Sequence, residues 1–381
     1  LDVDREVVAD AIAKCVAEKK LVIEDLNEDL EEFRVNNKAV YLAKFHTCET
    51  HIATRLTRLI KMPKSIRAVD SEKAVEWVQG QLSITLAEKQ VAAVKSALEN
   101  KVMIITGGPG TGKTTIINAV LKIFSKLTER ILLAAPTGRA AKRMAETSGH
   151  DAKTIHRMLE YSIAKGGFQK DDKKPLNGDL LIVDEASMID TILMHYLLKA
   201  IPFGATFILV GDVNQLPSVG AGNVLNDIIG SGAVPVAELN EIFRQARESR
   251  IIVNAHKINE GVMPYFQNDS SENDFYFIQQ EDPEKVLDII RRLVKDRIPG
   301  RFGHDPINDI QVLSPMHKGI VGAGNLNLEL QRMLNPGEDG VARGERNYRV
   351  DDKVMQIRNN YDKNVFNGDI GRITRINSED K

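Results

Sequence analysis

An α/β fold with a mainly parallel sheet is predicted by three features of the 381-residue sequence. From about residue 84 onward, short apolar runs alternate with segments of helical period. The runs are continuously apolar, as is typical of parallel strands buried on both faces. A glycine-rich turn directly follows one of them, at the end of a strand where sheets of this kind bind their ligands.

The expected elements follow in chain order. The predicted strands are Val102–Thr106, Ile131–Ala135, Leu180–Asp184, Thr206–Val210 and Pro235–Leu239, and the predicted helices are Lys113–Leu127, Arg139–Glu146, Thr191–Ala200 and Ala246–Glu260. A second αβ unit is expected from helix Glu284–Lys295 and strand Ile310–Ser314, followed by a strand-like tail from Arg343.

The first 80 residues have a different pattern. A helix is predicted over Asp4–Lys20, then two short apolar runs at 21–23 and 39–42, then a second helix over Phe45–Ile60. This order fits either a small winged-helix module or a helical linker domain. The predicted domains are therefore 1–80, mostly helical; 81–245, a sheet domain; and 246–381, a linker with part of a second domain.

Composition narrows the function classes. A net charge of −2 disfavours a purely electrostatic nucleic-acid binder, but allows contacts along one local groove. No apolar run approaches the length of a membrane span, the acidic start lacks a signal-peptide pattern, and two cysteines indicate no disulfide framework, so a cytoplasmic protein is expected. His46, Cys48 and His51 fit no common zinc spacing. The absence of an initiator Met suggests a piece of a longer protein.

The strongest motif spans Gly107 to Thr114 and follows the apolar run at 102–106. It fits the phosphate loop of P-loop NTPases, in which glycines let the backbone wrap a triphosphate and the next helix directs its positive dipole end at it. Lys113 is expected to reach the β- and γ-phosphates of ATP, and Thr114 to hold Mg²⁺. The expected nucleotide contacts here are Gly107, Gly108, Pro109, Gly110, Thr111, Gly112, Lys113, Thr114 and Thr115.

A pair of carboxylates forms the second half of the predicted ATP site. Asp184 and Glu185 end the apolar run at 180–183, which places them at the carboxyl end of a buried strand. Asp184 is expected to bind Mg²⁺, and Glu185 to polarise the attacking water.

Further segments indicate which kind of P-loop protein this is. The guanine-reading motif of GTPases and the signature motif of ABC-type ATPases are both missing from the sequence. Instead, four other motif-like segments follow one another along the chain: Ala134–Ala141, Thr154–Arg157, Gly211–Ser218 and Phe243–Gln245. In these residues the chain resembles superfamily 1 helicases, and most of all their RecD-like branch (superfamily 1B), over about residues 82–370.

The resemblance implies a fold of RecA-like parallel-sheet domains and an ATP-dependent DNA helicase of repair or recombination that moves 5′ to 3′ on single-stranded DNA. It implies that Gln90 recognises adenine, Gln215 senses the γ-phosphate and Arg244 contacts it. The DNA contacts that it implies are Pro136, Thr137, Gly138, Arg139, Thr154, His156, Ser314, His317 and Lys318. Small and hydroxyl residues at strand ends suit phosphate contact. For His156 a purely structural role is an equal alternative.

Two more segments carry expectations from the family. Residues 161–179 match the position of a β-hairpin that separates the strands at a duplex fork, with Phe168 at its base or against a base pair; a plain surface loop is the alternative. Segments 353–356 and 367–371 resemble the start of a small β-rich insertion in the second domain. The family's later motifs do not occur before Lys381, so we expect this chain to bind ATP, to hydrolyse it poorly and not to unwind DNA.

Two other functions compete with a DNA motor: a P-loop ATPase acting on protein, and a non-enzymatic ATP-binding switch. The combination of Gln215, Arg244 and the 136–139 segment favours the DNA motor. A monomeric motor is expected, whether it works alone or within a larger repair complex.

Overall fold

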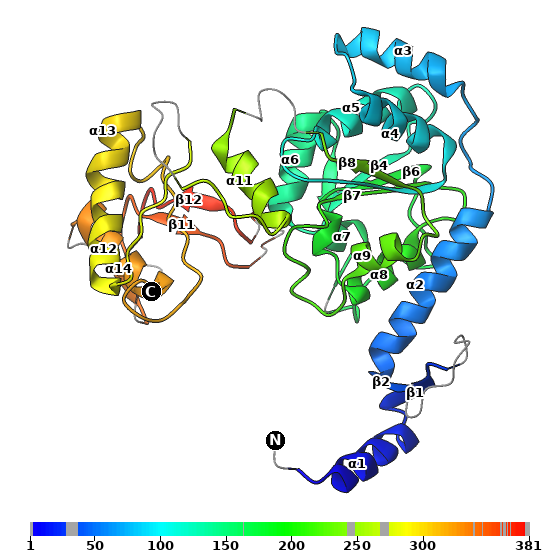
Figure 1. Ribbon diagram of the computed structural model, residues 1–381, viewed down its shortest axis with the longest axis horizontal. Coiled ribbons are helices and arrows are strands. Elements are labelled where there is room, and N and C mark those ends of the chain that lie inside the picture. The colour runs from blue at the N-terminus through cyan, green and yellow to red at the C-terminus, as the bar shows by residue number, and fades with distance from the viewer. Residues whose placement is uncertain are drawn as a thin grey trace. The chain divides into compact units, whose positions relative to one another are not determined.

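The computed structural model describes residues 3–27, 37–162, 164–241, 248–266, 274–337, 340–344, 346–358, 360, 363, 365 and 367–377 (Figure 1). The chain divides into two compact units, residues 1–264 and 265–381. The domain boundaries expected at residues 80 and 245 stay a prediction.

The first unit begins with two helices separated by a strand pair. Helix α1 (Arg5–Ala17) starts at Asp4, whose carboxylate accepts from the backbone N–H of Glu6, an N-cap. Strands β1 (Leu21–Asp25) and β2 (Lys38–Leu42) pair antiparallel and lead into α2 (Ala43–Lys61). The predicted order of helix, strand pair and helix is present in these residues.

A six-stranded parallel sheet forms the centre of the first unit, in the order β5-β4-β6-β7-β3-β8. Its strands are β3 (Val102–Gly107), β4 (Ile131–Ala135), β5 (Ala152–Thr154), β6 (Leu180–Val183), β7 (Thr206–Gly211) and β8 (Val236–Leu239). The α/β fold predicted from the sequence is confirmed, and β5 is a strand that the sequence pattern did not reveal.

The strands divide their side chains between two apolar cores. In β3, Val102 and Ile104 join one core, whereas Met103 and Ile105 join the other, because successive side chains of a strand point to opposite faces. Helices α3 (Ser71–Leu82), α4 (Glu88–Glu99) and α5 (Lys113–Phe124) cover one face of the sheet. On the other lie α7 (Ile155–Met158), α8 (Thr191–Ala200) and α9 (Val224–Gly230) (Figure 1).

Helix α2 also belongs to the second of these faces. Its buried side chains Ile52, Leu56 and Leu59 join the core beneath α8, so the N-terminal segment is packed against the sheet domain. The first unit also contains α6 (Gly138–Ser148) and α11 (Arg250–Asn259).

The second unit contains α12 (Pro283–Arg292), a π-helical turn η2 (Leu293–Arg297), α13 (Ile298–Phe302) and α14 (Ala323–Leu334). Two antiparallel pairs follow, β9 (Val341–Arg343) with β10 (Arg346–Tyr348), and β11 (Lys353–Met355) with β12 (Ile370–Arg372). The strand expected at Ile310–Ser314 is wrong: within the described residues this segment finds no partner strand, and the carbonyl of Ile310 instead accepts from Lys353 Nζ at 2.9 Å.

Candidate nucleotide and DNA site

The phosphate loop joins β3 to α5. Gly110 and Gly112 have φ values of 74° and 82°, a left-handed conformation that glycine adopts without strain. Lys113, the first residue of α5, donates from Nζ to the carbonyls of Gly107 at 2.5 Å and Gly108 at 3.0 Å. The Thr111 hydroxyl also donates to the Gly108 carbonyl, at 2.8 Å. The loop is thus held in a closed turn around the amino end of the helix, with two of the ammonium's three N–H groups used.

Carboxylates that follow two neighbouring strands lie close enough to this ammonium to act on its pKa. Asp184 and Glu185 follow β6, and the buried Asp212 follows β7, which lies between β6 and β3. One Asp184 oxygen accepts from the backbone N–H of Glu185 at 2.9 Å. Glu185 has a φ of 53°, a conformation strained for a residue with a β-carbon and typical of functional sites.

The charges of this site perturb one another. Burial lowers the pKa of Lys113, while Asp212, Glu185 and Asp184 act to raise it. Burial raises the pKa of Asp184, and burial together with Asp184 raises the pKa of Glu185. Asp184 and the exposed Thr114 beside Lys113 offer carboxylate and hydroxyl oxygens, the ligands that a hard divalent cation such as Mg²⁺ prefers.

The other expected nucleotide residues have specific surroundings. Gln215 donates from Nε2 to Asp212 at 3.4 Å, and its backbone N–H donates to the Asp212 carbonyl at 3.1 Å. Gln90 is 3% exposed, and its Oε1 accepts from the backbone N–H of Ala87 at 3.1 Å, capping α4. Pro109 and Thr115 lie in the loop and the first turn of α5. Arg244 lies outside the described residues.

The expected DNA residues of the first unit gather at the carboxyl ends of two adjacent strands. Pro136, Thr137, Gly138 and Arg139 follow β4, and Thr154 ends β5, paired with Ala135. The hydroxyls of Thr137 and Thr154 each cap a helix by accepting a backbone N–H at 3.2 Å. A hydroxyl that accepts in a cap keeps its O–H free to donate to a phosphate.

His156 belongs to an aromatic cluster at the same edge. Its ring lies 5.7 Å from Tyr161 and 5.4 Å from Phe168, and Phe168 lies 4.7 Å from Tyr196 of α8. Burial lowers the pKa of His156, which favours a neutral ring. Phe168 packs against the apolar core at the base of the 161–179 segment. In that segment Ser162 and Gly167 form one isolated antiparallel bridge.

Three expected DNA residues lie in the second unit. Ser314 donates to the Val321 carbonyl at 2.8 Å and so shapes the loop that carries His317 and Lys318, both exposed.

Two residues near the ATP site carried no prediction of a role there. Asp212 has a recognisable signal, since it follows a buried strand as Asp184 does. Arg143 of α6 also acts on the pKa values of Lys113, Asp184 and Glu185. Arg143 is an exposed residue of a helix, and nothing in the sequence indicates that it lies near the carboxylates that follow β6.

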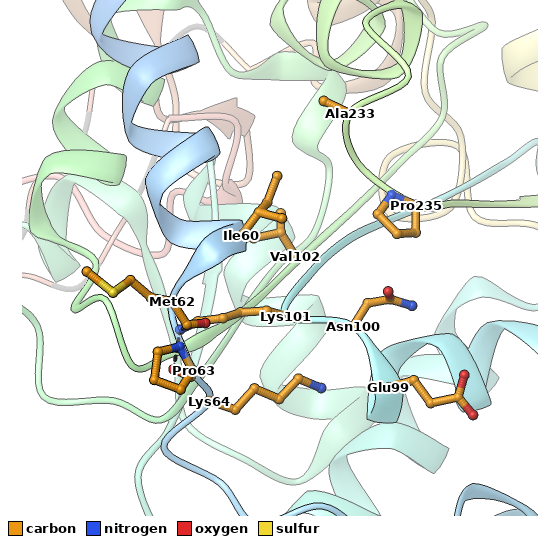
Figure 2. A pocket seen from close by; sticks show the side chains of 10 residues that line it. All are labelled: Ile60, Met62, Pro63, Lys64, Glu99, Asn100, Lys101, Val102, Ala233 and Pro235. Carbon is orange, nitrogen blue, oxygen red and sulfur yellow. Dashed lines mark hydrogen bonds between the residues drawn. The ribbon is translucent and has the colours of Figure 1, made fainter.

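An open hollow of about 500 Å³ lies at the other end of the strands from the phosphate loop, beside the amino end of β3 (Figure 2). Lys101 there donates to the carbonyls of Met62 at 3.0 Å and Pro63 at 2.6 Å, and Lys64 donates to the Leu98 carbonyl at 2.6 Å. Burial lowers the pKa of Lys64 to about 8. Because both ammonium groups serve backbone carbonyls, the hollow marks the junction of α2 with the sheet domain.

Within the described residues, no helix is long and apolar enough to cross a membrane. In that same part of the chain, no group of three or more His, Cys, Asp or Glu side chains is placed to hold a metal ion.

The parallel sheet, the phosphate loop and the paired carboxylates define a P-loop ATP-binding domain. Two family descriptions match the chain: an AAA domain at residues 90–221, and an ATP-dependent RecD-like DNA helicase SH3 domain at residues 326–381. The second match includes β11 and β12, where the sequence resembled a β-rich insertion.

The chain is also similar in sequence to RecD-type proteins. The chain is 35% identical over 336 residues to the ATP-dependent RecD2 DNA helicase of Deinococcus radiodurans, covering 88% of this chain and 44% of that protein. It is 29% identical to the RecBCD enzyme subunit RecD of Mycolicibacterium smegmatis, covering 74% of this chain and 56% of that one. The chain therefore spans about half the length of these relatives. In sequence it is similar to these RecD-like proteins.

Among solved structures, the chain is similar to Bacteroides Pif1 bound to single-stranded DNA, with a TM-score of 0.41 and 19% identity over 77% of this chain and 70% of that one. A structure of two Pif1 helicases at forked DNA gives a TM-score of 0.42 at 19% identity, over 77% and 72% of the two chains.

Proposed function

We propose that this chain binds and hydrolyses ATP at the phosphate loop and couples that reaction to movement along single-stranded DNA, as part of a DNA helicase of repair or recombination. The observation that carries the proposal is the Lys113 ammonium, held by two loop carbonyls and facing the carboxylates that follow β6 and β7. The family resemblance adds the DNA substrate and the 5′ to 3′ direction.

Each residue of the site has a chemical task in this proposal. Lys113 and the loop amides bind the phosphates, while Gln90 recognises adenine. Glu185 orients the attacking water, with Gln215 close to the terminal phosphate. Asp184 and Thr114 are the residues that would hold Mg²⁺, which supplies positive charge against the phosphates. Arg244 would add positive charge in the transition state.

DNA binding is proposed at the carboxyl ends of β4 and β5. The Thr137 and Thr154 hydroxyls donate to phosphates, Arg139 supplies exposed positive charge, and His156 with Tyr161 offers rings for stacking. Ser314, His317 and Lys318 are proposed to contact DNA from the second unit. This edge is separated from the phosphate loop only by β6 and β7, so DNA contact and nucleotide contact share the same sheet.

ATP hydrolysis with and without oligo-dT tests the proposal. Stimulation by oligo-dT supports a DNA motor, a constant rate indicates an ATPase acting on another substrate, and ATP binding without hydrolysis in either condition indicates a switch. The turnover expected of this chain is low, so the comparison rests on the ratio of the two rates. Strand displacement from substrates with a 5′ or a 3′ single-stranded tail, measured with the full-length protein, tests the direction.

A matched pair of variants tests the DNA edge. Thr137→Ala is expected to weaken oligo-dT binding measured by fluorescence anisotropy, because it removes a phosphate donor. Thr147→Ala, at an exposed position of the same helix α6, is the control and should leave DNA affinity unchanged. Equal affinities in both variants and the wild type would remove this edge from the proposal.

A further inference from the structure

Helix α11 contacts the phosphate loop through His256. A β-carbon built on Gly108 would stand 2.8 Å from Cε1 of the His256 ring, closer than real β-carbons come to other atoms, and 3.2 Å from its Nε2, a tight contact. The φ of Gly108 does not fall in the left-handed region, so its backbone would accept alanine. It is therefore the imidazole that leaves no room for a side chain at this position of the loop.

The polar atom of this contact lacks a partner. His256 Nε2 is buried and forms no hydrogen bond within the described part of the chain. Leaving such an atom unsatisfied costs free energy that an apolar side chain of similar size would avoid. A buried ring nitrogen without a partner, set against the loop that holds phosphates, indicates a group that acts when nucleotide is bound.

The position of helix α11 in the chain also connects His256 with the ATP site. Helix α11 begins at Arg250, shortly after Phe243–Gln245, the segment expected to contact the γ-phosphate. The carbonyl of Gly108, the residue under the ring, is one of the two that hold the Lys113 ammonium. His256 thus lies against the residue that orients the lysine of the site.

We propose that His256 is a positioning residue of the ATP site: its ring supports the phosphate loop at Gly108, and its Nε2 gains a hydrogen-bond partner when a nucleotide triphosphate is bound. The inference rests on the proposed ATP-binding function and adds to it a residue from a different element. Binding of triphosphate and the seating of α11 on the loop are then coupled.

Two substitutions separate the ring nitrogen from the packing. His256→Leu keeps apolar bulk but has no polar atom, whereas His256→Gln places an amide nitrogen at a similar distance from the backbone. We expect His256→Leu to weaken ATP–Mg²⁺ binding by about tenfold, equivalent to roughly 1.4 kcal/mol, and His256→Gln to recover most of that loss. Titration of a fluorescent ATP analogue measures both.

The melting temperature without nucleotide distinguishes positioning from simple structural support. Because His256→Leu removes an unsatisfied buried polar atom, the variant should melt at or above the wild-type temperature while it binds ATP more weakly. Ile258→Ala, at an exposed position of the same helix, is the control and should change neither property. A lowered melting temperature with unchanged ATP affinity would overturn the proposal and leave His256 a packing residue.

A double-variant cycle tests the contact itself. Gly108→Ala should weaken ATP binding by roughly tenfold or more, because its new methyl group displaces the ring or the loop. In the double variant Gly108→Ala with His256→Ala, the methyl group has room, so the two losses should not multiply. Fully multiplicative losses would refute the contact. Absence of ATP binding by the wild type would instead refute the proposed function, which keeps the two failures distinct.

Discussion

The guanidinium of Arg55 in α2 forms an ion pair with Asp172 of the 161–179 segment, with 2.7 Å between Nη1 and Oδ1. The same side chain donates to the carbonyls of Leu198 at 3.0 Å and Ile201 at 3.1 Å, at the carboxyl end of α8, and stacks on Phe203 at 3.8 Å. A cation is favourable at this end of a helix, where unpaired carbonyls accumulate. One residue of the N-terminal segment thus joins α2, α8 and the segment in which a fork-separating hairpin is expected.

Replacing Arg55 by alanine is expected to lower the free energy of unfolding by about 2–4 kcal/mol, because buried carbonyls of α8 lose their donor. Urea unfolding followed by circular dichroism measures the change. Arg58→Ala is the comparison variant, since Arg58 lies on the same helix but is exposed and contacts the Phe203 ring at 4.8 Å, so its loss should cost less. Asp172→Asn should cost less than about 1 kcal/mol, because the Asp172 side chain is 46% exposed. Equal effects of Arg55→Ala and Arg58→Ala would contradict the role given to Arg55.

Lys113→Ala is expected to reduce ATP affinity by roughly tenfold or more and to abolish hydrolysis, because the ammonium supplies the charge for the phosphates. Lys122→Ala on the exposed side of the same helix α5 should behave as the wild type. Isothermal titration with ATP and Mg²⁺ measures the affinity. Retained turnover in Lys113→Ala would show that the ATP site has been assigned wrongly.

Glu185→Gln is expected to bind ATP and to hydrolyse it roughly 100-fold or more slowly, because the amide cannot act as a base. Burial and Asp184 raise the pKa of Glu185. Its carboxylate form is therefore lost at a higher pH than for an ordinary glutamate, so the wild-type rate should fall on acidification earlier than an exposed carboxylate would predict. Rates of phosphate release across pH, with unfolding monitored in parallel, check this. A Glu185→Gln rate close to wild type would move the base to another residue.

His195 of α8 is expected to make the fold sensitive to acid. Burial and the neighbouring His51, whose ring lies 4.4 Å away, lower the pKa of His195 from 6.5 to about 4. The unfolded chain binds this proton at a higher pH than the folded chain, so the contribution to stability is present above pH 6.5 and is lost as pH falls toward 4. The loss should amount to roughly 1–3 kcal/mol.

The comparison of His195→Gln with the wild type isolates this effect from that of other groups. The urea midpoint of the wild type should fall more steeply between pH 7 and pH 5 than that of His195→Gln. His304→Gln, an exposed histidine of the second unit, is the control and should follow the wild type. Parallel pH profiles for all three proteins would show that His195 does not carry the sensitivity.

Much of the sheet and of the ATP site could be predicted from the sequence because their signals are local. A strand buried on both faces is apolar along its length, and this showed in β4, β6 and the centres of β3 and β7, whereas the edge strand β8 carries the exposed Glu238. Strand β5 has only three residues, too few for a pattern. Helices α4 and α9 also carried no prediction, although their residues belong to the cores. The strand expected at 310–314 had an apolar run but, among the described residues, found no partner strand.

By itself, the sequence determined the phosphate loop, the acidic pair and the positions along the chain of the strands that carry them. Glycine spacing and continuous apolar runs can be recognised without knowing which distant residues they contact. Tertiary structure decided which residues meet across the fold: Arg55 with Asp172, His51 with His195, and His256 with Gly108. These pairs are separated by more than one hundred residues, and the paths of the crossover helices bring them together. Local periodicity encodes which face of a helix is buried, but not which distant element packs against that face.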